Sequence, residues 1–173
     1  MKKSKKVALA AILCALSVLM LLLGSILTVL DLTMVCMASL LVMLAVIEIG
    51  GGYPYLIWLV TGVLAVLLLP DKFSALLYLL FGGIYPIFKA MFERLHYIVA
   101  WVLKLSCFNT MLTMLIFCVM FIFKLPDTEL GFTVPVYLVC NVVFVLYDFA
   151  ATQLITFYLI KLRKAMGLGN FFK

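Results

Sequence analysis

The stretch VALAAILCALSVLMLLLGSILTVL, residues 7–30, decides the fold of this chain, because it runs for 24 residues without a charge. A helix needs about 20 mainly apolar residues to cross the ~30 Å hydrocarbon core of a bilayer. The stretch meets that length and exceeds the apolar region of about 7–15 residues found in cleaved signal peptides. We therefore expect a retained transmembrane helix at the start of the chain.

Further apolar stretches of helix length cover most of the remaining sequence. They are 32–49, 55–69, 73–88, 97–123 and 133–160. Hydrophobic residues make up 68% of the chain and charged residues only 12%, which is too little polar material to cover a globular domain. We predict an all-α, polytopic integral membrane protein with six transmembrane helices in a single domain over residues 1–173. The third and fourth helices are the shortest.

Basic residues are divided unevenly between the two sides of the membrane that six spans define. Only Lys72 and Lys124 fall on one side, and Lys104 lies within a span. The other side receives the remaining ten, which are Lys2, Lys3, Lys5, Lys6, Lys89, Arg94, Lys161, Arg163, Lys164 and Lys173. Loops rich in Lys and Arg face the cytoplasm, so we predict a multi-pass protein of the cell (plasma) membrane with both termini cytoplasmic. The net charge of +6 then reflects topology and contact with anionic lipid, not nucleic-acid binding.

The sequence carries none of the motifs that would indicate an enzyme. No glycine-rich phosphate loop follows a strand, and the single histidine, His96, lies at the cytoplasmic side, away from any Ser-His-Asp or Cys-His set. The five cysteines fall inside apolar stretches without metal-ligand spacing. We expect no enzymatic activity, no cofactor and no metal site.

Asp148 is the most costly residue of the chain at membrane depth. It lies near the middle of the 133–160 stretch, where insertion of an Asp costs about 2.5–3.5 kcal/mol. Tyr137, Asn141 and Thr152 share its helical face. Two interpretations of this polar stripe stay open: it supplies ligands for a substrate or an ion, or it holds neighbouring helices together.

The 97–123 stretch contains two further polar features. Lys104 lies near its cytoplasmic end, and we favour an interpretation in which its side chain snorkels to the headgroups. An ion pair with Asp148 is the alternative, although their estimated depths differ by about 6–12 Å at 1.5 Å per residue. Asn109 lies in a stripe of Ser and Thr residues on nearly the opposite face. Contact with another helix is slightly favoured for Asn109 over a place in a cavity wall.

The sequence Gly82-Gly83-Ile84-Tyr85-Pro86 predicts an irregular fourth helix. Pro86 lacks the amide that would bond to the carbonyl of Gly82, and its ring crowds that carbonyl. We expect a kink at Gly82, Gly83 and Pro86. Interrupted helices line the binding sites of many transporters, but a purely structural irregularity is the favoured interpretation here.

Near the start of the chain, Ala11 and Ala15 form a pair of small residues four apart, which lets another helix approach closely. A basic N-terminus that leads into KVALAAILCALS, residues 6–17, resembles the opening of energy-coupling-factor transporter S components. Those are small bacterial membrane proteins with six helices and cytoplasmic termini. In that family an Ala-xxx-Ala motif on the first helix docks to the transmembrane coupling subunit, and Ala11 and Ala15 match it.

The resemblance implies an S-component-like bundle that captures a small solute, vitamin-like or similar, from the extracellular side. Its partners would be the lipid bilayer, a transmembrane coupling subunit and ATPase subunits. The candidate substrate-binding residues are Asp148, Asn141, Asn109, Thr152 and Tyr137. Two other functions stay open: a non-enzymatic scaffold or assembly protein of the MreD-like type, and a small ion- or proton-coupled carrier that uses Asp148.

Overall fold

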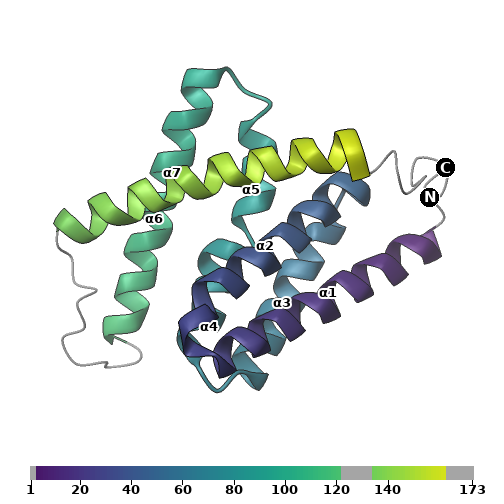
Figure 1. Cartoon of the computed structure of the whole chain (residues 1–173), viewed down its shortest axis with the longest axis horizontal. Helices are drawn as coiled ribbons and strands as arrows, with labels where there is room; N and C mark the ends of the chain where they lie inside the picture. The colour runs from purple at the N-terminus through teal and green to yellow at the C-terminus, as the bar shows by residue number, and fades with distance from the viewer. Residues whose placement is uncertain (1–2, 122–133, 163–173) are drawn as a thin grey trace.

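The structure is a computed structural model and describes residues 3–121 and 134–162, which form helices and the turns between them (Figure 1). The α-helices are α1 Lys3–Ile26, α2 Asp31–Glu48, α3 Tyr53–Leu68, α4 Lys72–Leu77, α5 Tyr85–Phe92, α6 Tyr97–Phe121 and α7 Val134–Phe157. Shorter helical turns are the 3₁₀ turn η1 Thr28–Leu30 and the π-helical turns η2 Tyr78–Gly82 and η3 Tyr158–Leu162.

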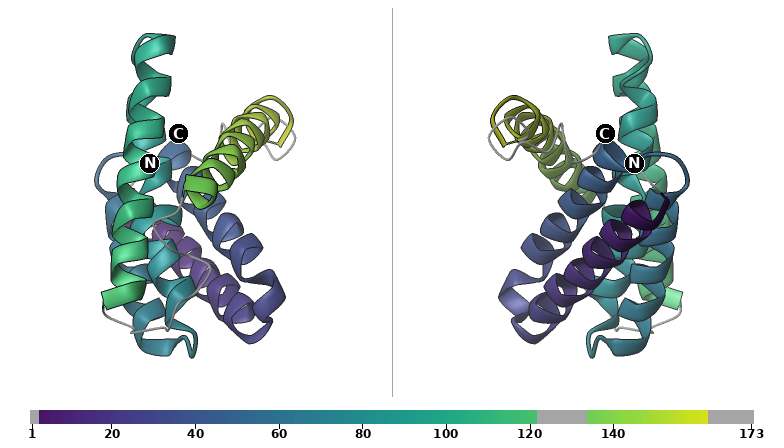
Figure 2. Two further views of the ribbon diagram at one scale, coloured as in Figure 1. Left: turned by 90° about the vertical axis from the view of Figure 1, so that its left-hand side faces the viewer. Right: turned by 90° about the vertical axis from the view of Figure 1, so that its right-hand side faces the viewer.

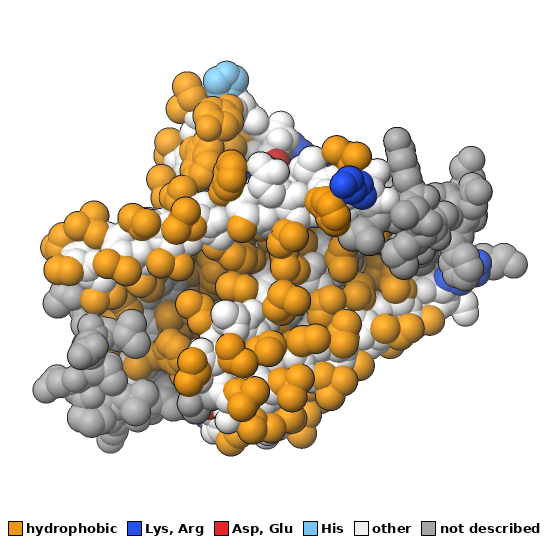
Figure 3. Space-filling view, viewed as in Figure 1, with side chains coloured by type: hydrophobic (Ala, Val, Ile, Leu, Met, Phe, Trp, Pro, Cys, Tyr) orange, Lys and Arg blue, Asp and Glu red, His pale blue; other side chains and the backbone are white. Residues whose placement is uncertain are grey.

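Five helical segments in the described residues are long and apolar enough to cross a membrane. They are α1, α2, the combined segment Lys72–Phe92, α6 and the segment Val134–Lys161. Helix α3 is also apolar, but its 16 residues span only about 24 Å at 1.5 Å per residue. Figure 3 shows hydrophobic side chains over most of the described surface of one face, with few charged ones. For residues 3–121 and 134–162, the prediction of an all-α fold with helices suited to a membrane is confirmed.

Several helix boundaries differ from the expected ones. The first helix covers Lys3–Ile26 instead of residues 7–30, because the chain turns at η1 before α2 begins. The expected helix 73–88 is divided into α4, η2 and α5. Gly50 and Gly51 make the turn between α2 and α3 with φ of 62° and 63°, values that favour glycine because it has no side chain to clash.

The first three helices pack closely against one another, and we call α1, α2 and α3 the N-terminal bundle. Its core is built from fully buried apolar side chains such as Leu21, Val42 and Ile57. Small residues bring the helices together: a Cβ added to Gly24 of α1 would lie only 2.8 Å from Met34 Cβ of α2. This region is therefore held together mainly by close apolar packing.

Helix α7 is attached differently. It crosses in front of α5 and α6 in Figure 1, and in Figure 2 it diverges from the direction of the α5–α6 hairpin. Phe144 of α7 stacks on Phe108 of α6 at 4.3 Å and meets the ring edge of Tyr85 at 5.1 Å. Only 17% of the α7 span is buried, compared with 44% of the span Lys72–Phe92. Much of α7 therefore faces away from the rest of the chain.

Candidate functional site

Asp148 is the centre of a buried network of charged groups contributed by three helices. Its Oδ1 accepts hydrogen bonds from the Tyr85 hydroxyl and from Lys89 Nζ of α5, both at 2.5 Å. Its Oδ2 accepts one from Lys104 Nζ of α6 at 2.9 Å. Tyr85, Lys89, Lys104 and Asp148 are all at most 5% exposed. Both oxygens of one carboxylate are thus bound by cations in the interior of the molecule.

Glu93 adds a second negative charge at the edge of this network. Its Oε1 lies 2.9 Å from Lys89 Nζ and 3.4 Å from Lys104 Nζ, and its side chain is 43% exposed. Lys89 also donates to Thr152 Oγ1 at 2.8 Å. The two lysines are therefore balanced by two carboxylates, which lowers the cost of burying the charges of Lys89, Lys104 and Asp148. We call Tyr85, Lys89, Glu93, Lys104 and Asp148 the charge network.

The helical register of α5 explains how three of the five members of the charge network come together. Tyr85, Lys89 and Glu93 follow one another at intervals of four residues, so they share one face of α5 and of the turn that follows it. The chain then reverses, and α6 brings Lys104 back beside them. Helix α7 crosses this hairpin where Asp148 meets Lys89 and Lys104.

The position of Lys104 corrects the favoured expectation that it would snorkel. Its side chain is buried, pairs with Asp148 and Glu93, and lies 5.4 Å from the centre of the Trp101 ring. The depth estimate was wrong because it counted residues along each helix as if the helices were parallel. Since α7 crosses the hairpin obliquely, the middle of α7 meets α6 near its first turns (Figure 1).

Sequence reasoning missed three members of the charge network. Lys89 was assigned to the basic cytoplasmic side, and Glu93 and Tyr85 were not singled out. The spacing of the three residues on one helical face was a readable signal, since Lys and Glu four apart in a helix commonly pair. Nothing in that spacing identified Asp148, which lies 59 residues after Lys89, as the further partner.

Asn109 and Asn141 lie together between α6 and α7. Each amide nitrogen donates to the other side chain's oxygen, at 3.0 and 2.9 Å, and also to the backbone carbonyl four residues earlier in its own helix. One turn away, the hydroxyls of Thr113 and Tyr137 are 2.9 Å apart. All four N–H donors of the two amides therefore have partners within the chain, an arrangement that holds the two helices together.

The predicted irregularity at Gly82 and Gly83 is present as the π-helical turn η2, after which α5 begins beside Pro86. The amide of Gly83 bonds to the carbonyl of Tyr78, five residues back, at 2.7 Å. The carbonyl of Leu79, which an α-helix would use there, instead accepts a hydrogen bond from Trp58 Nε1 at 2.9 Å. The backbone carbonyl that loses its helical hydrogen bond at the irregularity is thus hydrogen-bonded by a side chain of the same protein.

Ala11 and Ala15 lie on the exposed side of α1. The opposite side of the helix, including Leu13, Ser17 and Leu21, packs into the N-terminal bundle. The small-residue pair therefore lies on the outer surface of the described residues.

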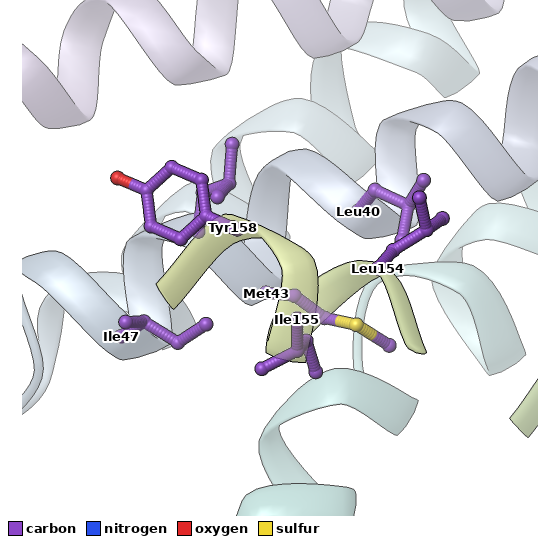
Figure 4. A pocket seen from close by; sticks show the side chains of 7 residues that line it. Leu40, Met43, Ile47, Leu154, Ile155 and Tyr158 are labelled. Carbon is purple, nitrogen blue, oxygen red and sulfur yellow. The ribbon is translucent and has the colours of Figure 1, made fainter. Parts of the chain in front are cut away.

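An apolar hollow of about 150 Å³ separates part of α7 from α2. It is lined by Leu40, Met43, Leu44, Ile47, Leu154, Ile155 and Tyr158. Figure 4 shows these side chains between the two helices. At its end, Tyr158 donates a hydrogen bond to Glu48 at 3.1 Å. The second half of α7 is therefore loosely packed on the N-terminal bundle.

In the part of the chain that the structure describes, His, Cys, Asp and Glu form no group of three or more suited to a metal ion. In the charge network, two ammonium groups and a phenol hydroxyl donate hydrogen bonds to the carboxylate of Asp148. This arrangement of donors is suited to binding a carboxylate group. Comparisons of the chain with models of protein families, with curated proteins and with solved structures found no match.

Proposed function

We propose that this chain is a non-enzymatic subunit of a larger membrane complex, of the S-component type, which captures a small solute from the extracellular side. The observation that carries the proposal is the exposed face of α1, where Ala11 and Ala15 leave room for a helix of another protein. That partner would be a transmembrane coupling subunit joined to ATPase subunits. In this arrangement both termini are cytoplasmic, in agreement with the distribution of basic residues.

The candidate solute-binding residues all lie on the inward side of α7 or on the helices it meets. Asn109, Asn141 and Tyr137 bond across α6 and α7, and Asp148 and Thr152 bond to α5 and α6. In the described conformation these groups contact one another. Solute capture therefore requires α7 to move away from α5 and α6, and the low burial of α7 supports such a movement.

The docking proposal is tested by purifying tagged protein from its own host membrane in mild detergent and identifying its partners by mass spectrometry. The Ala11→Trp variant should lose the coupling and ATPase subunits, because the larger side chain prevents close approach of a helix. Leu23→Trp is the matched control: Leu23 is 47% exposed on another part of α1, so this variant should keep them. If Ala11→Trp retains the same partners as the unchanged protein, docking through this face is wrong.

A scaffold or assembly protein is the second candidate, and a specific observation favours it. The polar side chains of α7 already bond to side chains of α2, α5 and α6, as expected if they only hold helices together. A scaffold should co-purify with cell-wall or division proteins. Its function should not require the hydrogen bonds between α7 and the other helices to break. The same purification therefore separates the two candidates through the identity of the partners.

A further inference from the structure

We propose that Tyr85, Lys89 and Lys104 form a receptor for the carboxylate of a small monocarboxylate solute, and that Asp148 occupies this receptor as a tethered stand-in. The solute would displace Asp148 and thereby release α7 from the α5–α6 hairpin. The inference rests on the proposed solute capture and names the class of solute, whose carboxylate would reach the α5–α6 hairpin near its predicted cytoplasmic end after the solute has entered from outside between α7 and the hairpin. It is independent of the docking face on α1.

The three donor side chains all lie on the α5–α6 hairpin, and none lies on α7. Tyr85 and Lys89 lie on α5, Lys104 lies on α6, and the two helices are joined by the short turn 93–96. Glu93 contacts both lysines and so holds their ammonium groups on one side. Together the three side chains donate hydrogen bonds to both oxygens of a single carboxylate. Tyr85 and Lys89 bind one oxygen, and Lys104 binds the other.

The charge balance selects the class of solute. With Glu93 in place, the two lysines need one further negative charge, which Asp148 supplies. If α7 withdrew without a replacement, two buried ammonium groups would face a single partly exposed carboxylate, an unfavourable state. A solute monocarboxylate restores both the charge and the hydrogen bonds. A neutral solute supplies no charge, and a dianion would leave the site with an excess of negative charge.

Helix α7 is the element whose attachment permits such an exchange. Its span is 17% buried, the lowest value among the five spans. Beyond the charge network, the described contacts of α7 include the aromatic stack at Phe144 and side-chain hydrogen bonds to α6 and α2. The hollow between α2 and α7 reduces their apolar contact further. Displacement of the Asp148 carboxylate therefore removes the ionic contacts of this helix with α5 and α6.

The first test uses the Asp148→Ala variant, which removes the stand-in and leaves space of carboxylate size. Its Tm in detergent is measured in 100 mM formate or acetate and in 100 mM chloride. We expect the carboxylates to raise Tm by about 3 °C or more over chloride, because a ligand that binds only the folded state stabilises it. The Asp148→Asn variant is the control, since its amide still fills the space and should show no difference between the salts. Equal Tm values for Asp148→Ala in all salts would overturn the inference.

The second test uses the unchanged protein, so that it stands if Asp148→Ala does not fold. Hydrogen exchange of the amides in residues 145–157 is measured in butyrate and in chloride at equal ionic strength. We expect at least a threefold faster exchange in butyrate, because the carboxylate competes with Asp148 and loosens α7. Identical exchange in the two salts would overturn the inference. Neither readout depends on the partner proteins, so failure here and failure of docking through Ala11 are distinguishable.

Discussion

The N-terminal bundle and α7 are both apolar in composition, yet the chain holds them in place by different means. Helices α1, α2 and α3 pack through buried aliphatic side chains and through glycine contacts such as Gly24 against Met34. Helix α7 buries only Phe144, Asp148 and Ala151 completely along its length. In a bilayer both the helices and the lipid are apolar, so close packing and interhelical hydrogen bonds decide which helices associate.

The polar contacts of α7 recur along its inward face and reach three different helices. Asn141 bonds to α6, and Tyr147 bonds to Ser39 of α2 at 2.6 Å. Asp148 reaches α5 and α6, and Tyr158 just beyond the helix reaches Glu48 of α2. Because each contact depends on a few atoms, α7 can be released stepwise, whereas the N-terminal bundle must separate whole packed surfaces. This difference leads to four predictions.

The largest effect is expected for Asp148→Ala in the absence of added carboxylate. Removing one partner of a buried charge network leaves Lys89 and Lys104 insufficiently paired, which costs about 3–5 kcal/mol. We expect the free energy of unfolding to fall by that amount and hydrogen exchange to increase in α7, while α1 and α2 keep their protection. The neighbouring Phe149→Ala is the control, because Phe149 is 63% exposed on the outer side of α7. Uniform loss of protection over all helices would contradict a separate attachment of α7.

The second prediction concerns the N-terminal bundle. Gly24→Ala places a Cβ 2.8 Å from Met34 Cβ, an atom close to the backbone that cannot move aside alone. We expect overpacking to lower the free energy of unfolding by about 1–3 kcal/mol and to increase exchange in α1 and α2. Gly52→Ala is the matched control, since a Cβ there meets no atom within 4 Å and its φ of −86° suits alanine. A greater effect on α7 than on α1 would contradict the division into two regions.

The third prediction concerns the amide pair between α6 and α7. Asn109→Leu should cost about 0.6–1.7 kcal/mol, the range of hydrogen bonds between membrane helices, because it leaves the Asn141 amide without its interhelical partner. The double variant with Asn141→Leu should cost less than the sum of the single changes, since no unpaired amide then remains. A double-mutant cycle on the free energy of unfolding measures this coupling. Strict additivity would show that the two amides do not interact.

The inward face of α7 could be predicted from the sequence, because helical periodicity is a local property. Tyr137, Asn141, Asp148 and Thr152 were placed on one face by their spacing, and the structure brings all four into contact with other helices or with the charge network. The apolar lengths likewise predicted the helical segments. The ends of the helical segments were less predictable, since the π-helical turn η2 is stabilised by a tertiary contact, that of Trp58 with Leu79.

The partners of α7 could not be predicted, because they depend on the angle at which helices cross. Lys104 was expected to snorkel because it lies near the cytoplasmic end of its predicted helix, whereas the oblique course of α7 brings Asp148 to it. Lys89 directly follows the predicted helix 73–88 and was placed in a cytoplasmic loop, where a basic residue usually serves topology. Its burial depends on a carboxylate much later in the chain. No local pattern contains that information.

The smallest effect is expected for Tyr147→Phe, which removes the hydrogen bond between Tyr147 and Ser39 and keeps the aromatic ring. Because this bond joins α7 directly to the N-terminal bundle, it tests how strongly the two regions are coupled. We expect a loss of about 0.6 kcal/mol in the free energy of unfolding, the average for interhelical side-chain bonds in membranes. Tyr55→Phe, at a 43% exposed position of α3, is the control. A loss above about 2 kcal/mol, beyond the range for such a bond, would mean that α7 and the N-terminal bundle unfold as one unit, and the two-region comparison would fail.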